Sequence, residues 1–198
     1  FIANPEYAPE IAEIKVLLND YISAGELFER KNDLKNAGIY YEKGEHYEKA
    51  RQIYSNLNDN EGISRMFEML GNLEKAFEYV IKPERKAHLL IKLERFADAM
   101  QFISGLSQVE NFRNLINEAV KKKIEIELSN KNFVEAIKLC EYCDKIDSRK
   151  GEILLEGRSF YKKKLNTAKN QEDITNIYSN LLLLEEFAGE FEEAAKIA

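Results

Sequence analysis

The chain has few of the residues that form disulfide bonds or break helices and strands. Its 198 residues include two cysteines, three prolines and nine glycines, and no tryptophan. Two cysteines cannot supply the disulfide framework of a small secreted domain, so we expect an intracellular, cytoplasmic setting. No proline follows Pro83, and helices beyond that point can therefore run without a proline break.

Long apolar runs and a surplus of basic residues are also missing. The longest apolar run is Leu181 to Leu184, far short of the roughly 18–20 residues that cross a bilayer. The opening residues lack the basic-then-apolar order of a signal peptide. The formal net charge of -6 argues against nucleic acid or an anionic membrane as the main partner. We therefore expect no membrane insertion and no nucleic-acid binding.

A short sequence motif, called a phrase below, recurs along the first half of the chain. Val, Ile and Thr never alternate with polar residues over four or more places, so no strand is predicted. Instead, a head residue, usually small, recurs every thirteen residues and then at slightly shorter steps: Ala24, Ala37, Ala50, Ile63, Ala76, Ala87 and Ala99. Bulky apolar residues follow three and four places later, and Leu57 and Leu70 follow seven places later. This spacing is the buried stripe of an amphipathic helix.

The corners between these stripes carry helix-capping residues. Thirteen residues hold about three turns of helix and a tight corner. Asp33, Asp59 and Asn72 stand in the corners, where their side-chain oxygens can cap the next helix. One such helix cannot bury its stripe alone, so successive helices must stack. The repeat therefore predicts an all-α fold, an α-solenoid of stacked antiparallel helix pairs.

The same residues resemble the tetratricopeptide repeat. The residues that match its pattern of large and small side chains, in order, are Tyr21, Ala24, Gly25, Phe28, Ala37, Tyr41 and Gly44. A helix pair takes about 26 residues here instead of the family's 34, and it lacks the family's tryptophan and closing proline. Short pairs of this kind look like the solenoids of coatomer, clathrin heavy chain and intraflagellar-transport subunits. The resemblance implies a right-handed superhelix that binds a protein or peptide partner.

We expect one solenoid segment over residues 1–198, with regular repeats at about 20–105 and longer, irregular helices at about 109–198. A stripe from Val109 to Ile124, which includes Leu115, predicts a helix of roughly six turns. Asn132 is predicted to cap a helix over Phe133 to Cys143. A last unit would begin at Gly189, with Phe191 and Ala194. Because the chain starts with Phe and this unit lacks its bulky residue, we expect a fragment of a longer protein.

Cys140 and Cys143 form a C-x-x-C motif. Redox versions of this motif sit at the start of a helix after a strand, whereas this pair is expected toward the end of a helix. A zinc site needs two more ligands, and the two histidines, His46 and His88, are far away in the sequence. We therefore interpret both cysteines as packing residues and expect no cofactor.

The remaining charged and polar residues suggest no chemistry. Neither histidine has a nucleophile or carboxylate at motif spacing, and no nucleotide-binding motif is present. Neighbouring glutamates such as Glu125 and Glu127, or Glu185 and Glu186, are interpreted as a solvated face. The runs Lys121–Lys123 and Lys162–Lys164 are interpreted as solvated flanks, with contact to an acidic partner or phosphate as the alternative. We predict no catalytic, cofactor-binding or metal site, and no enzyme.

Two hypotheses for function remain. The first is a protein–protein interaction scaffold whose stacked helices offer a long concave surface to a protein or peptide. The alternative is the regulatory or sensor part of a larger enzyme or signalling NTPase. The fold alone does not decide between them.

Overall fold

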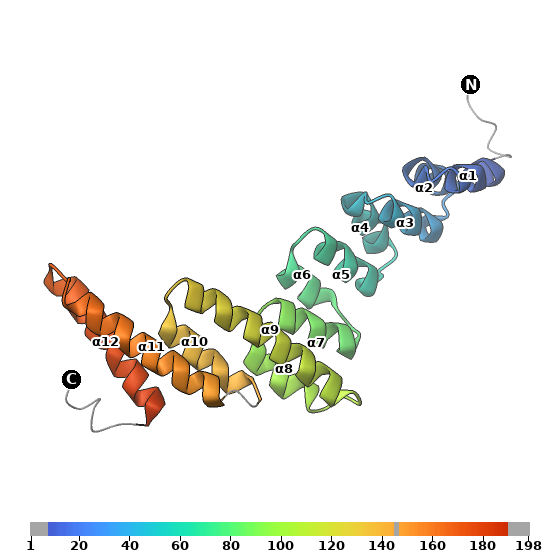
Figure 1. The fold of residues 1–198 in the computed structure, drawn as a ribbon. Coiled ribbons are helices and arrows are strands. Elements are labelled where there is room, and N and C mark those ends of the chain that lie inside the picture. The colour runs from blue at the N-terminus through green and yellow to red at the C-terminus, as the bar shows by residue number, and fades with distance from the viewer. Residues whose placement is uncertain (1–7, 145–146, 190–198) are drawn as a thin grey trace. The chain divides into compact units, whose positions relative to one another are not determined.

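The computed structural model describes residues 8–144 and 147–189. Within these residues the secondary structure is helical, without a strand, as Figure 1 shows. The predicted all-α class is confirmed. No helix in the described ranges is long and apolar enough to cross a membrane. The chain forms two compact units, residues 1–93 (unit 1) and residues 94–198 (unit 2).

Unit 1 is built from short helices that each pack against the next. In chain order they are α1 (Ala8–Leu17), α2 (Tyr21–Arg30), α3 (Leu34–Lys43), α4 (Tyr47–Asn56), α5 (Asn60–Met69), α6 (Leu73–Tyr79) and α7 (Pro83–Lys92). The helices α2 to α6 start at residues 21, 34, 47, 60 and 73, which are thirteen residues apart. The predicted period is therefore the spacing of the helices.

The corners of unit 1 share one backbone conformation. Residues with positive φ recur every thirteen positions, at Asn19, Asn32, Glu45, Asn58 and Gly71. The next residue closes the preceding helix: the Asp59 amide donates to the Tyr54 carbonyl at 2.9 Å, as in a Schellman motif. The Asp59 carboxylate then accepts from the Gly62 amide at 3.0 Å and caps α5. Asp33 and Asn72 cap α3 and α6 in the same way, as predicted.

The core of unit 1 is formed by the residues of the predicted stripe. Its buried members are Ala37, Tyr41, Ala50, Ile53, Tyr54, Ile63 and Met66, and Phe28 packs against them. The stripe was predicted one residue too long, however. Leu57 and Leu70 are 41% and 39% exposed, because each lies at the C-cap of its helix, where the chain has begun to turn.

Unit 2 contains longer helices. They are α8 (Phe96–Ile103), α9 (Val109–Ser129), α10 (Phe133–Leu139), the 3₁₀ helix η2 (Cys140–Tyr142), α11 (Asp147–Leu165) and α12 (Gln171–Ala188). The predicted six-turn helix is confirmed as α9. Its buried residues Phe112, Ile116, Val120 and Ile124 recur every four positions. Leu115 therefore lies beside this narrower stripe and is 38% exposed, so its predicted burial was wrong.

The helix predicted after Asn132 is shorter than expected. It ends at Leu139 and continues as one 3₁₀ turn. Asn132 is the N-cap residue, but its side chain accepts no capping hydrogen bond. Instead, its side-chain amide nitrogen Nδ2 donates to Glu127 Oε2 at 2.8 Å. Helix α10 packs against α9, α11 and α12, which places it at the centre of unit 2. The predicted last unit, with Phe191 and Ala194, lies outside the described residues.

Candidate protein-interaction surface

The C-x-x-C cysteines lie in the core of unit 2. Cys140 and Cys143 are free thiols, and they are 6% and 8% exposed. Burial raises the pKa of both thiols, which disfavours the thiolate that a nucleophile or a metal ligand needs. Among the described residues, no group of three or more His, Cys, Asp or Glu side chains could hold a metal ion.

The charged residues singled out in the sequence divide into exposed and buried ones. Lys162, Lys163 and Lys164 are exposed at the end of α11. Glu185, in contrast, is 2% exposed and forms an ion pair with Arg158 on α11. The solvated-face interpretation was wrong for Glu185, because a basic residue 27 positions earlier compensates its charge inside the protein. It was also wrong for Glu127, which is 9% exposed and pairs with Lys123 at 3.4 Å.

Unit 1 contains a repeated hydrogen bond between a buried tyrosine and a glutamate of the preceding helix. The Tyr41 hydroxyl donates to Glu29 Oε2 at 2.6 Å, and the Tyr54 hydroxyl donates to Glu42 Oε2 at 2.6 Å. Burial and the neighbouring carboxylate raise the pKa of both tyrosines. The bonds from Tyr41 and Lys49 lower the pKa of Glu29.

Ion pairs join alternate helices of unit 1 and define two rows. In the even row (α2, α4 and α6), Lys49 Nζ on α4 lies 2.9 Å from Glu29 Oε1 on α2. In the odd row (α3, α5 and α7), Arg65 on α5 pairs with Glu42 on α3 at 3.0 Å. Helices two apart in the chain therefore lie within side-chain reach of each other.

Charged side chains of the odd row form ion pairs with one another. Arg65 donates to both carboxylate oxygens of Glu42 at 3.0 Å, and its guanidinium carbon lies 5.4 Å from the centre of the Tyr54 ring. Burial opposes ionisation of Glu42, but the bonds from Arg65 and Tyr54 outweigh it and lower the pKa of Glu42. Further along, Arg85 on α7 pairs with Glu68 at 2.9 Å. Arginine side chains thus join successive helices of the odd row through ion pairs.

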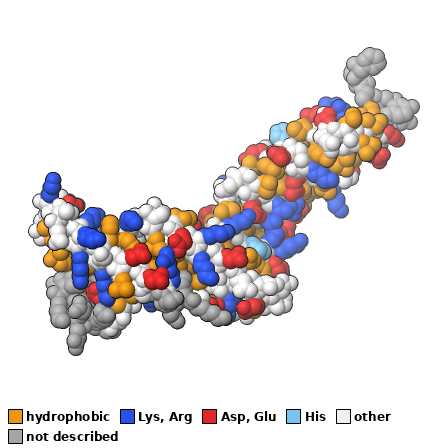
Figure 2. Space-filling model, in the orientation of Figure 1, with side chains coloured by type: hydrophobic (Ala, Val, Ile, Leu, Met, Phe, Trp, Pro, Cys, Tyr) orange, Lys and Arg blue, Asp and Glu red, His pale blue; other side chains and the backbone are white. Residues whose placement is uncertain are grey.

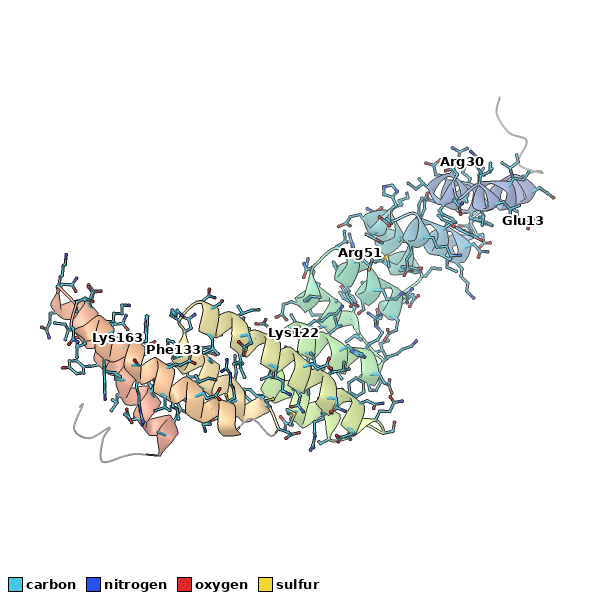
Figure 3. All side chains as sticks on the ribbon, viewed as in Figure 1. Glu13, Arg30, Arg51, Lys122, Phe133 and Lys163 are labelled. Atoms are coloured by element: carbon cyan, nitrogen blue, oxygen red, sulfur yellow. The ribbon has the colours of Figure 1, made fainter. Side chains whose placement is uncertain are left out.

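The even row carries two open hollows. The first, of about 580 Å³, lies between α2 and α4 and is lined by Glu26, Glu29, Arg30, Tyr41, His46 and Lys49. The second, of about 320 Å³, lies between α4 and α6 and is lined by Glu48, Arg51, Phe67, Leu70, Asn72 and Lys75. Figure 3 labels Arg30 and Arg51, one from each hollow.

The two hollows are successive copies of one arrangement. Half of their lining residues correspond at a spacing of 26 positions, and these pairs are Tyr41 and Phe67, His46 and Asn72, and Lys49 and Lys75. The aromatic ring comes from the intervening odd helix. In both hollows the lysine ammonium stands over that ring, at 5.9 Å from the centre of Tyr41 and 5.4 Å from the centre of Phe67.

Sequence reasoning missed this surface, although a signal for it was present. The same three residues, Glu-Lys-Ala, end the phrases at Ala50 and Ala76, so a lysine recurs beside the buried head residue of alternate helices. Figure 2 shows hydrophobic side chains interspersed with Lys, Arg, Asp and Glu on the face of unit 1 turned to the viewer. His46 was considered for catalysis and lies instead in the wall of the first hollow, with its ring edge-on to Tyr41 at a centre-to-centre distance of 5.9 Å.

The chain matches no protein-family model and no curated protein sequence. Repeated hollows with aromatic floors and charged walls can hold side chains that another chain presents at regular intervals.

Proposed function

We propose that this protein is a protein–protein interaction scaffold, an α-solenoid that resembles the tetratricopeptide repeat and serves as part of a larger assembly. The observation that carries the proposal is the recurrence of the same hollow along the even row at a spacing of 26 residues. Repeat proteins bind extended partners through such equivalent positions on successive helices. The partner is a protein or peptide segment that lies along α2, α4 and α6. The proposed setting is cytoplasmic, where free thiols such as Cys140 and Cys143 persist.

The make-up of the hollows supports a weak and reversible contact. Each combines an aromatic floor with charged walls, and the second adds Leu70, which is 39% exposed. A peptide in such a groove buries less surface than the roughly 1,200–2,000 Å² of a stable protein–protein interface. We therefore expect dissociation constants in the micromolar range, which correspond to about 8 kcal/mol of binding free energy.

A peptide-selection experiment tests the proposal. The protein is immobilised and used to select binders from a phage library of random dodecapeptides. The selected peptides are then labelled with fluorescein and titrated by fluorescence anisotropy. Leu70→Glu, at the rim of the second hollow, and Arg30→Glu, in the first, should each weaken binding of peptides that use that hollow by about tenfold or more.

Lys35→Glu is the matched control. Lys35 is exposed on α3, in the odd row, and it lies outside both hollows. The Lys35→Glu variant should therefore bind the selected peptides with the same affinity as the wild type. The proposal is wrong if the library yields no binder, or if Lys35→Glu weakens binding as much as the hollow variants do.

A further inference from the structure

The two hollows of the even row differ in how their lysine is neutralised. In the first hollow, Lys49 Nζ lies 2.9 Å from Glu29 Oε1. The other oxygen of Glu29 accepts the hydrogen bond from the Tyr41 hydroxyl at 2.6 Å. The charge of Lys49 is therefore compensated inside the protein, within a network of three side chains.

The second hollow lacks the glutamate and the tyrosine of this network. At a spacing of 26 residues, Ser55 takes the place of Glu29, and Phe67 takes the place of Tyr41. Lys75 is exposed and forms no ion pair within the described part of the chain. Its ammonium stands 5.4 Å from the centre of the Phe67 ring, and it is available to a carboxylate from outside.

A second basic residue adds to this charge. Arg51 occupies the position that Gly25 holds one repeat earlier. A Cβ on Gly25 would lie 3.0 Å from Tyr41 Cδ1, so the first hollow has little room for a side chain at this point. Arg51 lies over Phe67, with 5.2 Å from its guanidinium carbon to the ring centre, and pairs with Glu48 at 3.0 Å. The lining of the second hollow thus has two positive charges and one negative charge.

We propose that the second hollow binds an acidic residue next to an apolar residue on an extended peptide segment. Lys75 pairs with the carboxylate, because it has no acidic partner among the residues that the structure describes. Phe67 and Leu70 contact the apolar neighbour. The first hollow, whose lysine is already paired, has no such preference for an acid. This inference rests on the proposed function, since it assigns the chemistry of the partner at the same surface.

Two synthetic probes test the inference. One is a fluorescein-labelled octapeptide of alternating Leu and Asp, and the other replaces every Asp with Asn. We expect the acidic probe to bind the wild type at least about tenfold more tightly than the amide probe at low salt. Lys75→Glu should remove that difference, whereas Lys35→Glu, the same charge change outside the hollows, should keep it.

A reciprocal exchange of the two networks gives a sharper test. The double variant Ser55→Glu with Phe67→Tyr rebuilds the first hollow's network around Lys75 and should weaken the acidic probe by about tenfold. Glu29→Ser with Tyr41→Phe releases Lys49 and should restore binding of the acidic probe in the Lys75→Glu background. Circular dichroism melts confirm that each variant is folded at the temperature of the titration.

The outcomes separate this inference from the proposed function. Absence of binding by the acidic octapeptide, equal binding of the two probes, or no effect of Lys75→Glu would each overturn the preference for an acid. In these cases the peptides selected from the random library would still bind in a manner sensitive to Leu70→Glu or Arg30→Glu. If those peptides also ignore the hollow variants, the proposed function fails as well.

Discussion

Units 1 and 2 use the same corner but place it at different intervals. In unit 1, residues with positive φ recur every thirteen positions, and the helices α2 to α5 are each ten residues long. In unit 2, Lys131 has φ 64°, and the Asn132 amide donates to the Glu127 carbonyl at 2.9 Å, but the helix before this corner, α9, has 21 residues. Helix length is therefore decided by where corner residues occur, because the apolar stripe would allow a helix to continue.

The largest expected effect is on the network that is special to unit 1. Tyr41→Ala should lower the free energy of unfolding by about 3–5 kcal/mol, because it leaves a cavity in the core and removes a hydrogen bond to Glu29. Urea unfolding followed by circular dichroism measures the change. Lys35→Ala, at an exposed site on the same helix, α3, should change stability by less than about 0.5 kcal/mol. Equal effects of the two variants would mean that the thirteen-residue period does not define the core.

The next largest loss of stability is expected from enlarging Ala37, a head residue of the repeat. Ala37 is fully buried, so Ala37→Leu overpacks its surroundings and should cost about 1–3 kcal/mol. Ala119, on the long α9 of unit 2, is half-buried, and Ala119→Leu should cost less. Thermal melts compare the two variants, and a larger loss for Ala119→Leu would contradict the assignment of Ala37 to a close contact between helices.

A smaller loss of stability is expected from changing the positive-φ residue in the corner between α4 and α5. Asn58 has φ 54°, a conformation that costs a β-branched residue about 1–2 kcal/mol. Asn58→Val should therefore destabilise unit 1 by about that amount, whereas Asn58→Gly should be close to neutral. In unit 2, Lys131→Gly should be neutral or stabilising for the same reason. A neutral Asn58→Val in chemical denaturation would show that the corner does not set the period.

Acid should weaken unit 1 through the half-buried carboxylate of Glu42, with the smallest effect of the four. The pKa of Glu42 in the folded protein is below its ordinary value of 4.5. Glu42 therefore stabilises the fold above that pH, and the contribution is lost as the pH falls through the lowered pKa. Glu42→Gln should flatten the loss of stability below about pH 4.5, measured as urea midpoints across a pH series. If the urea midpoint of Glu42→Gln falls with pH as steeply as that of the wild type, Glu42 does not cause the acid sensitivity.

The sequence was sufficient for the fold of unit 1 because its signals are local. The stripe after Ala37 and the caps at Asp33 and Asp59 each depend on residues within one helix or corner. The limits of the stripe were harder to predict, since Leu70 follows the helical spacing but lies where the chain has already turned. The hollows could not be predicted in the same way. They depend on contacts between alternate helices, such as the pair of Lys49 with Glu29, and a helical period does not specify which of these pairs form.

The alternation of rows has a consequence for how such a chain can change in length. Each phrase of thirteen residues moves the chain from one row to the other. Insertion of a single phrase after α4 would transfer every later helix to the opposite row, and Lys75 would leave the groove. Insertion of 26 residues, the spacing of the two hollows, would keep the rows in place and add one more hollow. The parity of inserted phrases, rather than their sequence, thus decides whether duplication extends the groove or breaks it.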